Sequence, residues 1–204
     1  MATHFQIQLH SIRVIENGTI EHEKGSNGLA VTLYYPTPGK TSLVTTRRIE
    51  LLDNVTYDYT QEDFSKQILF KEAILDSAYI VVELTSIKEP TKLGLIFYKL
   101  FKGIVDKALD VIPGGAIVTA IAKNVTGSLV DLIEPEDKVE IIGRAGWLIS
   151  ETIGSVELPL QLKVPKAITL SKISVDRAGN TIYTTKNIPQ DYVNAQVTLT
   201  IKKI

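Results

Sequence analysis

The sequence of 204 residues contains no cysteine, one methionine, one tryptophan and three histidines. Without cysteine the chain forms no disulfide bond, no thiolate metal site and no cysteine nucleophile. Its formal net charge is only -1, so it lacks the basic balance that is typical of nucleic-acid-binding domains. We therefore exclude nucleic acid from the expected partners.

Long apolar runs are also missing. No segment reaches the roughly 18 apolar residues that are needed to span a bilayer. Residues 1–10 alternate polar and apolar side chains, and they lack the basic start and apolar run of a signal peptide. We expect a cytoplasmic protein, with peripheral attachment to a membrane as the alternative.

Catalytic motifs are absent as well. His4, His10 and His22 have no nucleophile-and-base pattern around them, and their spacing matches no zinc motif. The Walker and dinucleotide-binding patterns do not occur. The acidic residues of 134–137 fit a solvated turn better than a cation site. We expect no catalytic residue, no metal and no cofactor, so the chain is predicted not to be an enzyme.

Most of the sequence alternates polar and apolar residues in short segments separated by turn residues, as half-buried β-strands do. The alternation in residues 5–14 falters at Ser11 and Ile12, which indicates a bulge or a bend. The β-branched run at 78–85 predicts a central strand, and Pro159 predicts an edge strand. Further strands are expected at 29–35, 42–52, 67–73, 138–149, 155–163, 168–175, 181–185 and 193–202, and a loop at 25–28. We expect one mainly β domain over residues 1–204, a Greek-key antiparallel β-sandwich.

Between residues 91 and 133 the apolar period changes from two to about 3.6, which predicts an inserted pair of amphipathic helices around Gly114-Gly115. Six apolar residues of the first helix form a candidate interaction surface: Leu93, Ile96, Phe97, Leu100, Phe101 and Ile104. Three lysines form its basic flank: Lys92, Lys99 and Lys102. This 91–133 segment either covers the sandwich, as most amphipathic helices face a core, or contacts a protein or membrane surface.

Three stretches resemble the C-two type of calcium- and phospholipid-binding β-sandwich. Residues 5–14 are similar to its opening strand, residues 78–87 to its central strand after Phe70 and Glu72, and residues 137–149 to a later strand. The resemblance implies a lipid-binding sandwich with aspartate-rich calcium loops. Here residues 86–90 contain no aspartate pair, so we expect binding that does not depend on calcium. The 91–133 segment is not a standard element of that family.

Three functions stay open. The first is a non-enzymatic binding module whose 91–133 segment contacts a protein partner or a membrane surface. The second is a structural or assembly protein that forms homo-oligomers through that segment. The third is a hydrolase whose residues are dispersed over loops and leave no motif. No feature of the sequence selects a ligand.

Overall fold

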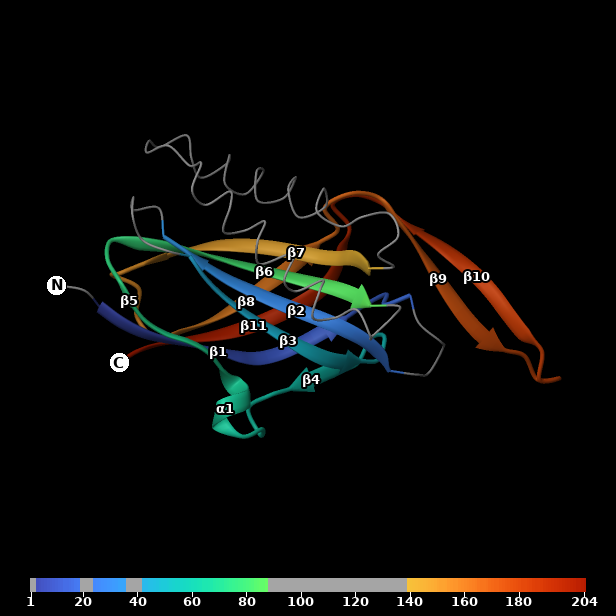
Figure 1. The fold of residues 1–204 in the computed structure, drawn as a ribbon, viewed down its shortest axis with the longest axis horizontal. Coiled ribbons are helices and arrows are strands. Elements are labelled where there is room, and N and C mark those ends of the chain that lie inside the picture. The colour runs from blue at the N-terminus through green and yellow to red at the C-terminus, as the bar shows by residue number, and fades with distance from the viewer. Residues whose placement is uncertain (1–2, 19–23, 36–41, 88–138) are drawn as a thin grey trace.

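A computed structural model describes residues 3–18, 24–35, 42–87 and 139–204 (Figure 1). These residues form mainly β-strands, which confirms the predicted fold class at that level. The elements are β1 (Thr3–Val14), β2 (Gly25–Tyr34), β3 (Leu43–Leu51), β4 (Thr56–Asp58), α1 (Phe64–Gln67), β5 (Ile68–Ile74), β6 (Ser77–Ile87), β7 (Val139–Ser150), β8 (Val156–Lys163), β9 (Ile168–Val175), β10 (Thr181–Ile188) and β11 (Val193–Lys203).

Nine of these strands form one antiparallel sheet in the order β3-β2-β6-β7-β8-β11-β1-β4, and β5 also pairs with β1. The sheet is nearly closed, because side chains of β3 reach β5 from the opposite end of this order. The Thr45 hydroxyl donates a hydrogen bond to the Leu69 carbonyl at 3.0 Å, and the Arg47 guanidinium donates one to the Ile68 carbonyl. Near-closure leaves fewer unpaired strand edges than an open sheet would have.

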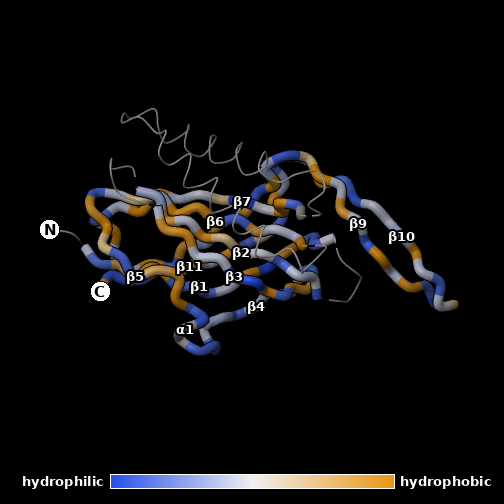
Figure 2. Tube along the Cα trace, viewed as in Figure 1, coloured by the Kyte–Doolittle hydropathy of each residue, from blue (hydrophilic) through white to orange (hydrophobic). Residues whose placement is uncertain are grey.

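The hydrophobic core lies inside this curved sheet, where alternate residues of each strand point inward. Figure 2 shows apolar residues interspersed with polar ones along the strands of the nine-stranded sheet. The largest of the fully buried side chains are Phe5, Ile7, Leu9, Ile12, Leu29, Leu33, Leu51, Ile74, Ile80 and Leu84. Burial of each such side chain contributes about 1.5–3 kcal/mol to stability. The bulge predicted in β1 is confirmed, since its register with β11 shifts between Leu9 and Ser11.

The central strand is also confirmed, and the edge position of Pro159 is confirmed in part, because β8 lies between β7 and β11 in the sheet order. β6 pairs with β2 on one side and with β7 on the other, and both of its faces are buried. β8 pairs with β11 over its whole length but with β7 only at Lys163. Within the described ranges, its Pro159 therefore lies where β8 has no strand on one side, a position in which proline is tolerated.

The loop predicted at residues 25–28 is wrong. These residues begin β2, where Gly25 lies opposite Leu51 and Gly28 lies between Arg48 and Thr85. Glycine and asparagine favour turns locally, but two flanking strands supply hydrogen bonds that outweigh this preference. The neighbouring strands are distant in sequence, so the local composition does not indicate them.

The predicted hairpin of β9 and β10 is confirmed as a separate two-stranded sheet. Figure 1 shows it projecting from the end of the large sheet that lies away from the two termini. The Asp176 carboxylate stabilises its turn by accepting hydrogen bonds from the backbone N–H groups of Ala178 and Asn180, both at 2.8 Å. Gly179 adopts a φ of +85°, a conformation that favours glycine.

The predicted helical pair lies outside the described residues. Within the part of the chain that the structure describes, no helix is long and apolar enough to cross a membrane.

Candidate functional site

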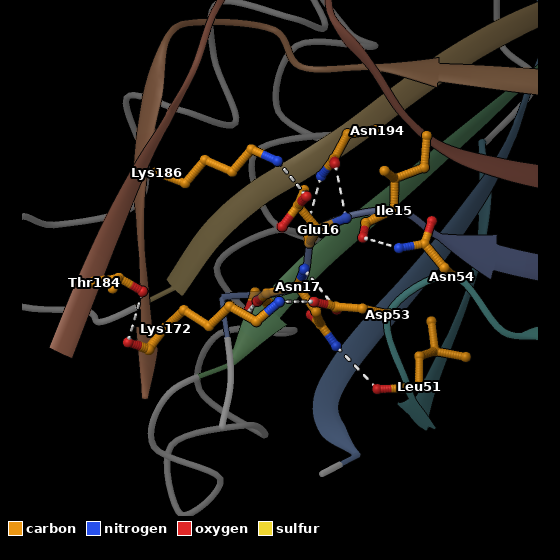
Figure 3. A network of polar contacts seen from close by, with 11 residues as sticks. Ile15, Glu16, Asn17, Leu51, Asp53, Asn54, Lys172, Thr184, Lys186 and Asn194 are labelled. Atoms are coloured by element: carbon orange, nitrogen blue, oxygen red, sulfur yellow. Dashed lines mark hydrogen bonds and ion pairs between the residues drawn. The ribbon is translucent and has the colours of Figure 1, made fainter. Parts of the chain in front are cut away.

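Four charged side chains meet where the β9–β10 hairpin joins the large sheet (Figure 3). Lys172 of β9 places its Nζ 3.5 Å from Oδ2 of Asp53, which follows β3. Lys186 of β10 forms an ion pair with Glu16, which follows β1. The strand register puts both lysines on the same face of the hairpin. We call Glu16, Asp53, Lys172 and Lys186 the hairpin-base cluster.

Two buried asparagines lie beneath this cluster and bind each other through their side-chain amides. Asn17 Nδ2 donates to Asn27 Oδ1 at 2.9 Å, and Asn27 Nδ2 donates to Asn17 Oδ1 at 2.7 Å. Their remaining amide hydrogens reach the Leu51 carbonyl at 3.1 Å and the Thr85 carbonyl at 3.0 Å. This pair therefore links the end of β1 to β3 and β6 without leaving a buried donor unpaired.

A third buried asparagine, Asn194 of β11, fixes the backbone of Glu16. Its Oδ1 accepts a hydrogen bond from the Glu16 N–H at 3.1 Å, and its Nδ2 donates to the Glu16 carbonyl at 2.9 Å. The same Nδ2 also lies 3.0 Å from the Ile142 carbonyl of β7. Glu16 is thus held rigidly in the position from which its carboxylate meets Lys186.

The electrostatics of the hairpin-base cluster follow from its partial burial. Burial raises the pKa of the Asp53 carboxyl, while Lys172 and the hydrogen bond from the Asn17 N–H act in the opposite direction. The hydrogen bond with Glu16 raises the pKa of Lys186. Each acid faces its own lysine, so the cluster is suited to holding the hairpin on the sheet.

A second charged pair is buried between β6 and β7. Arg144 donates to Glu83 through Nε at 2.6 Å and also through Nη2. Burial raises the pKa of the Glu83 carboxyl, and Arg144 opposes that shift. The Nη1 atom of Arg144 is buried and has no hydrogen-bond partner among the described residues. The pair faces outward from the core-facing residues of β6, because Glu83 lies between the inward-pointing Val82 and Leu84.

The residues weighed for catalysis or metal binding do not assemble into a site in the described part of the chain. His10 contacts Thr200 Oγ1 at 3.2 Å and Glu157 at 3.5 Å, whereas His22 lies outside the described residues. Glu62 pairs with Lys66 at 2.8 Å. No three acidic, histidine or cysteine side chains in the described ranges are close enough together to hold a metal ion.

The predicted interaction surface and its basic flank, from Lys92 to Ile104, also lie outside the described residues. Both stay predictions from the sequence pattern.

Exposed apolar side chains mark two places that the sequence analysis missed. On the hairpin, Val175, Ile182 and Tyr183 are 64%, 43% and 75% exposed. On β7, Trp147 and Leu148 are 49% and 44% exposed. Ile182 and Tyr183 are neighbours in one strand, as are Trp147 and Leu148, so both faces of each strand carry an exposed apolar side chain. Only the tertiary arrangement reveals that no described strand covers them.

No protein-family model matches the chain, and no curated protein matches it.

Proposed function

We propose that the chain is a non-enzymatic, calcium-independent binding module with a Greek-key β-sandwich scaffold that contacts a protein partner or a membrane surface. The observation that carries this proposal is the projecting hairpin, on which Val175 and Tyr183 are exposed on one face and Ile182 on the other. Large apolar side chains grouped on a projecting surface are typical of interaction sites, and tyrosine is enriched at protein interfaces.

The attachment of the hairpin supports this function. A two-stranded hairpin is at best marginally stable in water when it stands alone. Here Lys172 and Lys186 bind Asp53 and Glu16, so the base of the hairpin is held on the sheet. The tip is thereby presented in a defined direction, which lowers the entropy that binding would otherwise cost.

The 91–133 segment is the second part of the proposal and rests on its sequence pattern alone. Its apolar face with flanking lysines is typical of a helix that lies in a membrane interface. The hairpin and this segment supply different contacts, so they are tested separately.

The experiment compares two double variants with a matched control. One carries Val175→Ser with Tyr183→Ser, and the other carries Phe97→Ser with Phe101→Ser. Leu75→Ser is the control, because Leu75 is also an exposed apolar residue and lies outside the hairpin. Each protein is measured by light scattering for self-association and by co-sedimentation with vesicles of equal parts phosphatidylcholine and phosphatidylserine.

We expect the wild type to bind in at least one assay. One double variant should lose that binding while its melting temperature stays unchanged, and the control should retain it. Unfolding of the Phe97/Phe101 variant would show instead that this face is core, since truncation of a buried phenylalanine costs about 3–5 kcal/mol. Wild-type binding that survives in both double variants contradicts the proposal.

A further inference from the structure

Among the described residues, half of strand β7 has an edge that no other strand pairs with. It pairs with β6 from end to end, but it pairs with β8 only at Arg144, opposite Lys163. Residues 145–150 therefore have no strand on their second side in the part of the chain that the structure describes. Backbone N–H and C=O groups on such an edge are available to pair with another strand.

The strands β7 and β8 diverge here, and they differ in how they are protected against pairing with a further strand. The unpaired part of this edge of β8 carries Pro159 and the exposed Glu157, and both proline and charged side chains oppose the addition of another strand. Residues 145–150 of β7 read Ala-Gly-Trp-Leu-Ile-Ser and include no charge and no proline. The edge of β7 therefore has the features of a strand that accepts a partner.

We infer that this edge of β7 pairs with the same edge of a second copy of the chain, in antiparallel orientation about a twofold axis at Trp147. In an antiparallel pair, directly opposite residues share one face of the sheet, so the axis must place a residue opposite its own copy. With Trp147 on the axis, Gly146 lies opposite Leu148 and Ala145 lies opposite Ile149.

The order of side-chain sizes favours a second copy over an unrelated strand. Two small residues precede Trp147 and two large ones follow it, so each small residue meets a large one across the axis. The two indoles form a central cross-strand aromatic pair, an arrangement that stabilises antiparallel sheets. No like charges oppose each other within residues 145–150, because the segment has none. This surface shares no residue with the hairpin or the 91–133 segment.

The first test uses the tryptophan itself, which is the single one in the chain. We expect the mass measured by analytical ultracentrifugation to approach that of a dimer as concentration rises, and the fluorescence emission to shift to shorter wavelength in parallel as the indole leaves water. A chain that stays monomeric at all accessible concentrations overturns the inference, as does dimerisation without a fluorescence change.

Charge placed on the axis tests the register. Trp147→Lys brings two lysines opposite each other, and we expect dimerisation to weaken by roughly tenfold or more, since like charges directly opposite are destabilising. Tyr183→Lys is the matched control on the hairpin and should dimerise as the wild type does. If Trp147→Lys fails to fold, Leu148→Lys takes its place. It changes the other face of β7 and should also weaken the dimer.

Mixing Trp147→Lys with Trp147→Glu should restore a dimer that contains one copy of each, because only this register places residue 147 opposite itself. Failure of the mixture to dimerise, with both variants folded, overturns the twofold arrangement. A dimer abolished by Phe97→Ser with Phe101→Ser but kept in Trp147→Lys would assign self-association to the 91–133 segment instead. The hairpin proposal is unaffected by either result, because it is measured with Val175 and Tyr183.

Discussion

The large sheet and the β9–β10 hairpin satisfy their polar groups in different ways. In the sheet, Asn17, Asn27, Glu83 and Arg144 are buried and bind side chains or carbonyls of other strands. In the hairpin, most side chains are exposed, and the Asp176 turn supplies local hydrogen bonds. The sheet therefore depends on contacts between distant segments, whereas the hairpin depends on a local turn and the two ion pairs at its base.

The largest loss of stability is expected when one member of the buried Glu83–Arg144 ion pair of the sheet is removed. Arg144→Met leaves the Glu83 carboxyl buried without its cation, and breaking such a pair costs about 3–5 kcal/mol. We expect this loss in the free energy of unfolding, measured by urea denaturation at neutral pH. It should diminish in acid, because burial raises the pKa of Glu83 and a protonated carboxyl needs no cation.

The matched control for Arg144 is the double variant Glu83→Leu with Arg144→Met. Replacement of both members of a buried pair by apolar residues is often neutral or stabilising, so the double variant should recover most of the lost stability. A loss below about 1 kcal/mol in the single variant would contradict a buried, mutually dependent pair.

The next effect concerns the asparagine pair beneath the hairpin-base cluster. Asn27→Ala removes both of the hydrogen bonds that join the two side chains, and it leaves the buried Asn17 amide short of partners. This should lower the free energy of unfolding by about 1–3 kcal/mol. Asn187→Ala, which changes an exposed asparagine of β10, should cost less than about 0.5 kcal/mol. Equal losses of unfolding free energy in the two variants would contradict the view that buried polar contacts stabilise the sheet more than exposed ones stabilise the hairpin.

A smaller effect is expected from the ion pairs that join the regions. Lys172→Met with Lys186→Met should lower global stability by no more than about 1 kcal/mol per pair, because both lysines keep contact with solvent and such ion pairs contribute little. Hydrogen exchange of the β9 and β10 amides should nevertheless accelerate, while that of β6 stays unchanged. Lys202→Met, at an exposed position of β11, is the control. Unchanged exchange in the hairpin would show that the lysines do not hold it.

The strands predicted best are those with a local sequence signal, which is alternation in residues 5–14, a β-branched run in 78–85 and a short turn in 168–185. The bulge at Ser11 and the edge position of Pro159 were also found from local signals. The strand at 25–28 was missed because its partners, near Leu51 and Thr85, lie far away in the sequence.

The candidate site could not be predicted for a similar reason. Asn17, Asn27 and Asn194 are unremarkable polar residues until three distant segments bring them together, and the sequence contains no spacing that reveals their contacts. The exposure of Trp147 depends on where β7 and β8 diverge, which only the full sheet order determines. The interaction surface at Leu93–Ile104 stays a prediction from periodicity.

The smallest effect is a dependence of stability on pH at the junction of the two regions. Burial raises the pKa of Asp53 above its usual value of 3.8. As pH rises from that value through the raised pKa, the unfolded chain loses this proton before the folded protein does, so this group makes folding less favourable. Asp53→Asn has no such proton. The melting temperature of the wild type should therefore fall relative to that of Asp53→Asn across this window, measured in steps between about pH 3 and pH 7. A difference that changes in the opposite direction would mean that Lys172, rather than burial, dominates the environment of Asp53.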